Sequence, residues 1–211
     1  MTLDRQIFDD AENTAATPCF TPGTHIATPK GERKIEDLKP GDAVVTRDNG
    51  LQTVRWVGAK VFPRRKVAHT PHLRPILIRA RSLGNGLPER DMMVSPNHRM
   101  LVTKDRTSLH FEEPEVLVAA KHMVDNRGVC RAGAVDTCYV HILFDHHQVV
   151  LANGAWTESF QPDDHTLKGI GNAQRTEIME LFPELETKEG LRNYAPARRV
   201  LTREEAIQLV E

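Results

Sequence analysis

The chain has 211 residues, of which 39% are hydrophobic, and its 28 basic and 29 acidic side chains give a formal net charge of −1. This length suits one compact domain with an appendage, and a second full domain is not expected. No apolar run approaches the ~18 residues that a membrane helix needs. The basic run at 64–66 lacks interleaved aromatic residues, so we expect it to form a solvated loop and not to bind nucleic acid. We also expect no membrane partner.

Residues 1–18 are polar and acidic, with neither the basic start nor the apolar stretch of a signal peptide. We interpret them as a mostly irregular leader, and we expect a protein that stays in the cytoplasm or leaves by a route that this leader does not show. The chain has three cysteines, Cys19, Cys130 and Cys138, and none belongs to a Cys-x-x-Cys pair. A disulfide framework or zinc ribbon is therefore not expected, which leaves thiol-based chemistry or none.

Short β-prone segments follow the leader and are separated by turn residues. Asn-Gly pairs at 49–50 and at 153–154 lie between such segments, which is a strong hairpin signal. The expected strands are 26–28, 44–46, 52–57, 76–79, 92–94, 100–103, 139–144, 148–151 and 155–160. Many short strands punctuated by glycine and proline predict a mainly β fold. Residues 111–124 are expected to form a loop with at most one helical turn.

The character of the chain changes after Pro162. Apolar residues recur at helical spacing in 172–181, and a capping-box pattern opens at Thr202 ahead of the apolar residues in 206–210. We therefore expect two short helices that pack on the β body through their apolar stripes. The predicted fold class is a mainly β domain with a short helical C-terminal extension.

The most specific pattern is the run 19–24, Cys-Phe-Thr-Pro-Gly-Thr, followed by Ile-Glu-Asp-Leu at 35–38 and Gly-Asp at 41–42. It resembles the opening block of the Hint domain, the self-processing module shared by hedgehog proteins, inteins and bacterial intein-like proteins, and most of all the short bacterial group. The resemblance implies a horseshoe of short strands with pseudo-two-fold symmetry. It also implies that Cys19 attacks the peptide bond after Pro18, an N-to-S acyl shift that gives a thioester.

Attack by Cys19 on the preceding carbonyl is intramolecular, through a five-membered ring, and so has a high effective molarity. The fold must still protonate the amide nitrogen and hold the oxyanion. Hint domains carry a Thr-x-x-His block in which the His contacts the scissile nitrogen and the Thr helps to hold the carbonyl. Ser95 and His98 occupy these positions in Ser-Pro-Asn-His. A histidine there can donate a proton near neutral pH, whereas the match on its own also fits a structural histidine.

A third block, 139–160, resembles the C-terminal blocks of inteins and keeps their Ala-Asn-Gly turn at 152–154. The spacing from His147 to this turn is one residue longer than usual. Three residues therefore stay open as the further catalytic acid or base: His141, Asp145 and His147. On a strand these residues would share one face, which would also suit a metal ion. We expect no dedicated metal site and no cofactor.

Inteins end in His-Asn followed by Cys, Ser or Thr, and the Asn cyclises to release the downstream segment. The corresponding positions here hold Glu158 and Ser159, followed by Phe160. Without Asn, protein splicing is not expected, and the sequence is similar to the hedgehog arrangement, in which water or an outside nucleophile resolves the thioester. The sterol-recognition region of hedgehog proteins is not evident, so the acceptor stays unknown. Pro18 crowds its own carbonyl and is expected to slow the reaction.

These patterns predict an upstream segment at 1–18, a Hint autoprocessing domain at 19–160 and a helical extension at 161–211. The upstream segment is the expected substrate, and the oligomeric state stays open. Two alternatives remain. One is a catalytically silent Hint scaffold that binds or supports another protein. The other is a Cys-His hydrolase acting in trans, which would need an open substrate groove at Cys19.

Overall fold

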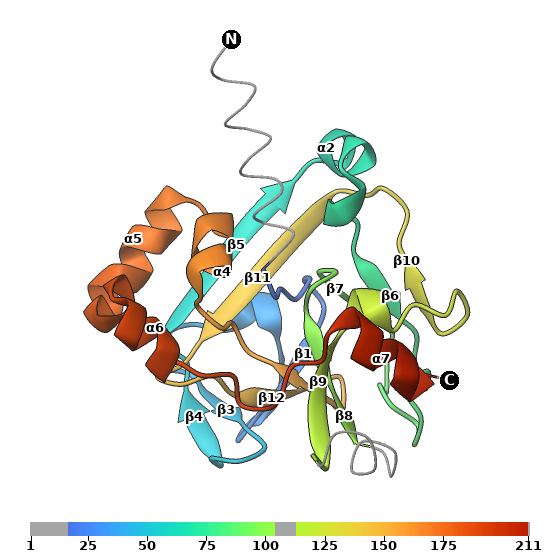
Figure 1. The fold of residues 1–211 in the computed structure, drawn as a ribbon, viewed down its shortest axis with the longest axis horizontal. Helices are drawn as coiled ribbons and strands as arrows, with labels where there is room; N and C mark the ends of the chain where they lie inside the picture. Colours follow the sequence, from blue (N-terminus) through green and yellow to red (C-terminus); the bar gives the residue numbers. More distant parts are fainter. Residues whose placement is uncertain (1–16, 104–112, 211) are drawn as a thin grey trace.

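The computed structural model describes residues 17–103 and 113–210. Within these ranges the chain forms short strands followed by a C-terminal group of helices (Figure 1). The strands are β1 (His25–Thr28), β2 (Gly31–Lys34), β3 (Ala43–Val45), β4 (Leu51–Thr53), β5 (Trp56–Phe62), β6 (Ile76–Ile78), β7 (Met92–Val94), β8 (Arg99–Thr103), β9 (Glu115–Ala119), β10 (Val129–Arg131), β11 (Thr137–Leu143), β12 (Val149–Ala152) and β13 (Ala155–Glu158). The α-helices are α2 (Arg64–His69), α4 (Asp164–Gly169), α5 (Asn172–Leu181), α6 (Lys188–Asn193) and α7 (Arg203–Val210). The 3₁₀ helices are η1 (Ile35–Asp37), η2 (Pro71–Leu73), η3 (Ala120–His122) and η4 (Pro183–Glu186). None of these helices is long and apolar enough to cross a membrane.

The strands pair antiparallel, and the sheets share one main core. The largest sheet has the order β2-β1-β12-β13-β8-β9, and β10-β6-β7 and β3-β4 form smaller ones. The long pair β5 and β11 runs diagonally across the molecule in Figure 1, with His141 opposite Gly58 and Tyr139 opposite Lys60. Strands of all these sheets supply the main core, which includes Val44, Ile78, Met100, Val140, Ile142 and Phe144.

The segment that carries Cys19 enters the body between two strands. Phe20 forms bridges with Val94 of β7 and with Val140 of β11, and its N–H and C=O each bond Val140 at 2.9 Å. The N–H of Ser95 donates to the carbonyl of Cys19 at 2.9 Å. Phe20 is 2% exposed and belongs to the main core, and burying such a ring stabilises the fold by on the order of 2 kcal/mol. This burial holds the peptide bond before Cys19 inside the protein.

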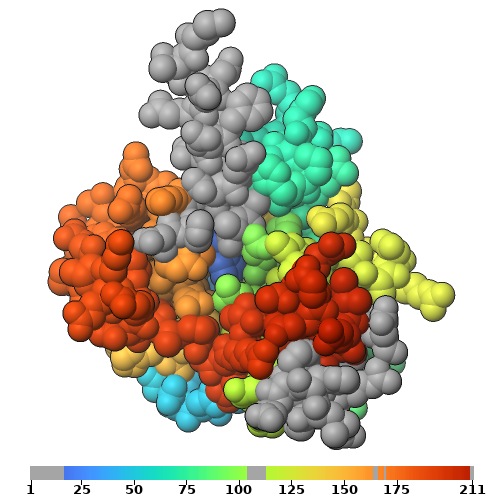
Figure 2. Space-filling model, viewed as in Figure 1, coloured from blue at the N-terminus to red at the C-terminus, as the bar shows by residue number. Residues whose placement is uncertain are grey.

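The C-terminal extension covers two sides of the β body (Figure 1, Figure 2). The cluster under α4, α5 and α6 contains Trp56, Leu143 and Phe160 of the β body. The cluster under α7 contains Val116, Val118, Ala206 and Leu209. Between the two clusters, Leu117 of β9 donates to the carbonyl of Arg199 at 2.8 Å and accepts from the N–H of Leu201 at 2.9 Å. The extension therefore belongs to the same folded body as the strands.

The predicted mainly β fold with a helical C-terminal extension is confirmed. Both Asn-Gly pairs lie in hairpin turns, between β3 and β4 and between β12 and β13. In the second turn Asn153 and Gly154 have φ angles of 46° and 77°. Positive values of this kind are accessible to Asn and Gly at little cost, which explains why the pair is a reliable hairpin signal.

Three sequence predictions about local structure were wrong. The predicted loop at 111–124 contains strand β9, because its Val-Leu-Val run is buried throughout and lacks the alternation that marks a half-exposed strand; residues 111–112 lie outside the described ranges. The basic run 64–66 opens helix α2, which Val67 anchors by packing against Phe62. The tail forms α4, α5, η4, α6 and α7 rather than two helices, since several of these are too short for periodicity to detect.

Candidate active site

Cys19 lies at the centre of the site and is completely buried. It packs with Phe62 of β5, Val67 of α2 and Tyr139 of β11. Its thiol donates to the carbonyl oxygen of Thr17 at 3.1 Å, and burial raises the pKa of the thiol well above its usual range. The thiol is therefore protonated at neutral pH, and it needs a base before it can act as a nucleophile.

The imidazole of His141 on β11 contacts both the thiol and the carbonyl of the bond that would be cleaved. Its Nε2 lies 3.8 Å from Cys19 Sγ, and its Nδ1 lies 3.1 Å from the carbonyl oxygen of Pro18. Because a carbonyl oxygen only accepts hydrogen bonds, Nδ1 carries the ring proton and Nε2 has a free electron pair. Burial lowers the pKa of His141 to about 4, so the ring is neutral at pH 7. One ring thus presents a base to the thiol and a donor to the carbonyl.

Two aromatic side chains fix the orientation of the His141 ring. Trp56 stacks on it with ring centroids 6.2 Å apart, and Phe160 meets it edge-on at 5.3 Å. The indole of Trp56 in turn donates to a carboxylate oxygen of Glu177, on α5, at 2.8 Å. The C-terminal extension therefore contributes, through Trp56, to the position of a ring in the candidate site.

Ser95 follows β7 and holds the nitrogen side of the same peptide bond. Its Oγ accepts from the N–H of Cys19 at 2.9 Å and donates to the carbonyl of Thr17 at 2.7 Å. The resemblance implied that Ser95 helps to hold the scissile carbonyl. That contact belongs to His141, and Ser95 contacts the nitrogen and the carbonyl one residue upstream.

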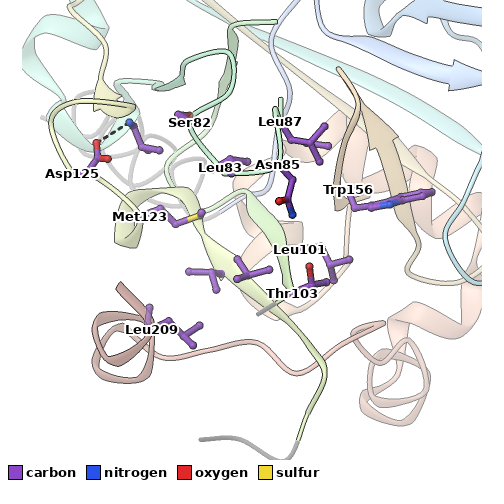
Figure 3. Close-up of a pocket in the computed structure, with 16 residues that line it drawn as sticks. Ser82, Leu83, Asn85, Leu87, Leu101, Thr103, Met123, Asp125, Trp156 and Leu209 are labelled. Atoms are coloured by element: carbon purple, nitrogen blue, oxygen red, sulfur yellow. Dashed lines mark hydrogen bonds between the residues drawn. The ribbon is translucent and has the colours of Figure 1, made fainter. Parts of the chain in front are cut away.

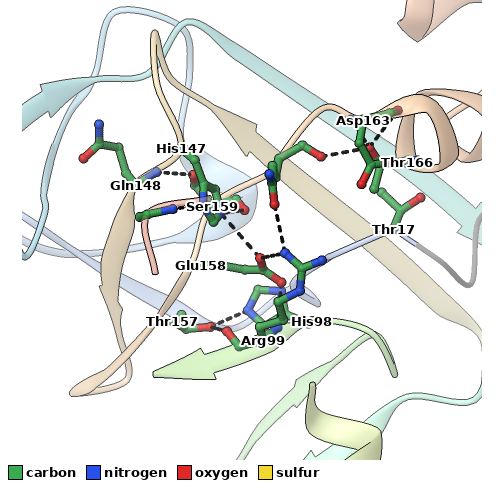
Figure 4. A network of polar contacts seen from close by, with 12 residues as sticks. Thr17, His98, Arg99, His147, Gln148, Thr157, Glu158, Ser159, Asp163 and Thr166 are labelled. Carbon is green, nitrogen blue, oxygen red and sulfur yellow. Dashed lines mark hydrogen bonds and ion pairs between the residues drawn. The ribbon is translucent and has the colours of Figure 1, made fainter. Parts of the chain in front are cut away.

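His98 closes the same turn, since its N–H donates to the carbonyl of Ser95 at 3.1 Å. The ring is buried next to Phe20, and its Nε2 lies 2.6 Å from Oγ1 of Thr157 on β13 (Figure 4). Burial lowers the pKa of His98 to about 4. In the described part of the chain, Nδ1 has no hydrogen-bond partner and no hydrogen bond joins the ring to Cys19. The contact with the scissile nitrogen that the resemblance implied for His98 is made by Ser95.

Asp145 lies away from Cys19. Strand β11 ends at Leu143, so the single strand face that His141, Asp145 and His147 were expected to share does not form. The Asp145 side chain is 54% exposed and pairs with Arg55 at 3.4 Å. Across 17–103 and 113–210, no three His, Cys, Asp or Glu side chains gather in a way that could hold a metal ion.

His147 belongs to a polar network that Figure 4 shows together with His98 and Thr17. Its Nδ1 accepts from the N–H of Ala197 at 2.9 Å, and its Nε2 lies 3.2 Å from the carbonyl oxygen of Ser159. Glu158 is completely buried, and its carboxylate accepts from the backbone N–H of Arg99 at 2.7 Å and from its guanidinium at 3.0 Å. His147 Nε2 lies 3.4 Å from the same carboxylate. None of these contacts joins His147 to Cys19.

Sequence reasoning missed Thr157 and the role of Glu158. One signal was available, because both are polar residues inside the predicted strand 155–160 and neither sits at its end. A polar side chain that a strand buries must find a hydrogen-bond partner. Such a position therefore points to a network, although the partners come from distant parts of the chain.

A separate pocket of about 290 Å³ lies between α7, β8 and the loop at 82–87 (Figure 3). Residues that line it include Leu101, Met123, Trp156 and Leu209. None of the residues described above around Cys19 lines this pocket, so we give it no part in the chemistry at that site.

Comparisons with known proteins place the chain in a family. A family model of the Hint domain matches residues 18–164, whereas a search among curated proteins found no match. The chain is similar to the solved bacterial intein-like domain from Clostridium thermocellum, with 15% identity over 67% of this chain and 97% of that chain and a TM-score of 0.43. It is also similar to the gp41-1 intein, with 12% identity over 66% of this chain and 97% of that chain and a TM-score of 0.39. Because the family model spans well over half of its residues, the chain belongs to the Hint domain family.

Proposed function

We propose that this Hint domain cleaves its own chain: Cys19 attacks the carbonyl carbon of Pro18 and converts the peptide bond between them into a thioester. One observation carries the proposal. The peptide bond has a hydrogen-bond partner on each side, His141 on its oxygen at 3.1 Å and Ser95 on its nitrogen at 2.9 Å, and the thiol lies beside it. Such an arrangement favours attack, because donors that are already in place need no reorganisation when charge develops.

In the proposed reaction, His141 takes the thiol proton at Nε2 while the sulfur forms the new C–S bond. The positively charged ring then faces the developing oxyanion with its Nδ1–H. The C–N bond breaks next and the nitrogen of Cys19 gains a proton, so that one proton moves from sulfur to nitrogen overall. The candidate proton donors for the second step are Ser95, which is hydrogen-bonded to this nitrogen, and His98, which closes the same turn.

We further propose that water or an outside nucleophile resolves the thioester and that no splicing follows. The carboxylate of Glu158 is bound by Arg99, and Oγ of Ser159 accepts from the N–H of Gln148 at 3.0 Å. Neither side chain has an amide nitrogen that could attack the carbonyl of Ser159 and release the tail. The packing of the extension in two core clusters supports its retention.

Intact-mass measurement tests this proposal. The purified chain is incubated with hydroxylamine or with a thiol, either of which captures a thioester. We expect release of residues 1–18 from the wild-type chain and none from Cys19→Ala, which lacks the nucleophile. A wild-type chain that keeps its full mass, while circular dichroism reports a folded β protein, would assign the domain to a catalytically silent scaffold.

A hydrolase that acts in trans is not supported, because Cys19 is completely buried and its thiol contacts the carbonyl of its own upstream residue Thr17. Such an enzyme needs a thiol that an added substrate can reach. Addition of a small ester should therefore produce no turnover.

A further inference from the structure

Thr157 determines which nitrogen of His98 carries the ring proton. The hydroxyl of Thr157 donates to the backbone carbonyl of Arg99 at 2.8 Å. A hydroxyl has one proton to donate. The Thr157 hydroxyl can therefore only accept a hydrogen bond from Nε2 of His98, which lies 2.6 Å away. His98 must then carry its proton on Nε2.

The position of Thr157 is itself fixed. It pairs with Met100 across β13 and β8, and it is completely buried. Glu158 accepts from the backbone N–H and from the guanidinium of Arg99, which holds the residue whose carbonyl receives the Thr157 proton. Figure 4 shows these contacts joining Glu158, Arg99, Thr157 and His98 in one network.

The other nitrogen of His98, Nδ1, is consequently without a proton. Within the described residues it has no hydrogen-bond partner, although the ring is 1% exposed. A buried acceptor without a hydrogen bond destabilises the folded protein. The alternative tautomer would set an electron pair on Nε2 against the oxygen of Thr157, which has no second proton to offer. Thr157 thus favours the tautomer that leaves Nδ1 open.

We propose that Thr157 is a positioning residue, which holds His98 in the Nε2–H tautomer so that His98 enters the reaction as a proton acceptor at Nδ1. This inference rests on the proposed autoprocessing function. His98 can then protonate the nitrogen of Cys19 only after Nδ1 has received a proton, and the reaction itself frees one when the thiol is deprotonated. That proton, which Nε2 of His141 takes from the thiol as the C–S bond forms, then passes to Nδ1 of His98 and from there to the nitrogen as the C–N bond breaks.

Nuclear magnetic resonance of ¹⁵N-labelled histidine tests the tautomer directly, in a Cys19→Ala background that cannot react. We expect the His98 signals of a ring protonated on Nε2 at pH 7. Thr157→Val, which keeps the shape and removes the hydroxyl, should mix the tautomers, and Thr157→Ser should restore the original signals. A His98 ring protonated on Nδ1 in the presence of Thr157 would overturn the inference, whether or not the wild-type chain cleaves itself.

With Cys19 in place, Thr157→Val should slow thiol-induced cleavage about tenfold, the effect expected when a buried donor loses its partner. Thr157→Ser should cleave at nearly the wild-type rate. Thr46→Val is a matched control, because Thr46 is also buried and its hydroxyl donates to the carbonyl of Gly50 at 2.8 Å, in the turn between β3 and β4. The positioning role would be contradicted if Thr157→Val cleaved more slowly with an unchanged His98 tautomer. It would also be contradicted if Thr46→Val lost as much of the cleavage rate as Thr157→Val. Absence of cleavage in the wild-type chain would instead count against the proposed function and leave the tautomer measurement to decide the role of Thr157.

Discussion

Two carbonyl groups, one near the start and one near the end of the Hint domain in the sequence, each lie against a buried histidine, and only the first has a thiol beside it. The carbonyl of Pro18 lies 3.1 Å from Nδ1 of His141, and the carbonyl of Ser159 lies 3.2 Å from Nε2 of His147. Nε2 of His141 faces the thiol, and Nδ1 of His147 accepts a hydrogen bond from Ala197. In each ring the nitrogen that faces the carbonyl therefore carries the proton. Under the proposed function, a polarised carbonyl is therefore not by itself enough to select a bond for cleavage.

The two ends also differ in how they use charge. Around Cys19 the rings of His98 and His141 are neutral, because burial lowers the pKa of each to about 4. Around Ser159 the neighbouring side chains form an ion pair between Glu158 and Arg99, and Thr157 links the backbone of Arg99 to His98. A neutral ring can accept the proton that a nucleophile must lose, whereas a paired carboxylate and guanidinium hold a fixed geometry. The first arrangement suits a reaction and the second suits a structural closure.

The largest expected effect separates the two histidines. His141→Gln keeps a donor for the carbonyl of Pro18 but removes the base, so thiol-induced cleavage should slow by ~10²-fold or more. His147→Gln is the matched control and should leave the rate within about twofold. The rates come from intact mass over time. Equal losses in the two variants would show that both act through folding, and the comparison between the two ends would fail.

A second, smaller effect follows from the pKa values of the two neutral rings. In the unfolded chain a histidine takes up its proton near pH 6.5, whereas His98 and His141 resist protonation down to about pH 4 when folded. The unfolded state therefore binds more protons between these values, so stability falls as the pH falls. Each ring should cost about 2 kcal/mol between pH 7.5 and pH 5.

Urea unfolding of Cys19→Ala at these two pH values measures the loss. His141→Gln in the same background should remove about 2 kcal/mol of the pH-dependent change, because one of the two rings is gone. His147→Gln should leave the contribution of His98 and His141 to the pH-dependent change in stability intact. A stability that does not change between pH 7.5 and pH 5 would mean that the two rings are not buried and neutral in the folded protein.

The smallest expected effect is new cleavage after position 159, where the wild-type chain is not expected to be cut. Ser159→Asn places an amide nitrogen next to a carbonyl that His147 already contacts, and such a side chain can cyclise on its own backbone. We expect slow release of the tail from 160 onward, reaching a few per cent of the chain as a rough expectation. In the control Ser159→Leu, the leucine side chain has nearly the shape of asparagine but no amide nitrogen, so no tail should be released. Denaturing mass spectrometry distinguishes a cut tail that stays bound from an intact one. Complete absence of release from a folded Ser159→Asn would show that the ion pair, and not the missing nucleophile, keeps this end closed.

Much of the fold could be predicted from the sequence because its signals are local. The Asn-Gly pair at 153–154 needs positive φ angles, which two adjacent residues determine. Strand β9 could not be predicted, since its burial depends on α7 and on residues 199–201, which come from another part of the chain. The leader at 1–16 lies outside the described residues, and its predicted irregular structure stays a prediction.

The candidate site divides in the same way. Cys19 and Ser95 are predicted from their blocks, whereas His141 was one of three candidates left open. The structure brings these three residues to one peptide bond. Asp145 was a candidate because the register of the third block was uncertain, and the structure places its exposed side chain next to Arg55. The division of contacts between Ser95 and His141 depends on hydrogen bonds between segments 76 and 123 residues apart, which no local pattern encodes.

Ser95 holds the nitrogen of Cys19 at 2.9 Å in a site that water does not reach. If the acyl group moves to sulfur, the freed amine stays next to the thioester, and burial disfavours its charged form. A neutral amine in that position attacks the thioester and restores the more stable amide. Forward and reverse shifts would then alternate many times before any product appears. The amount of upstream segment released would measure how often a nucleophile reaches the thioester, and not how often Cys19 attacks.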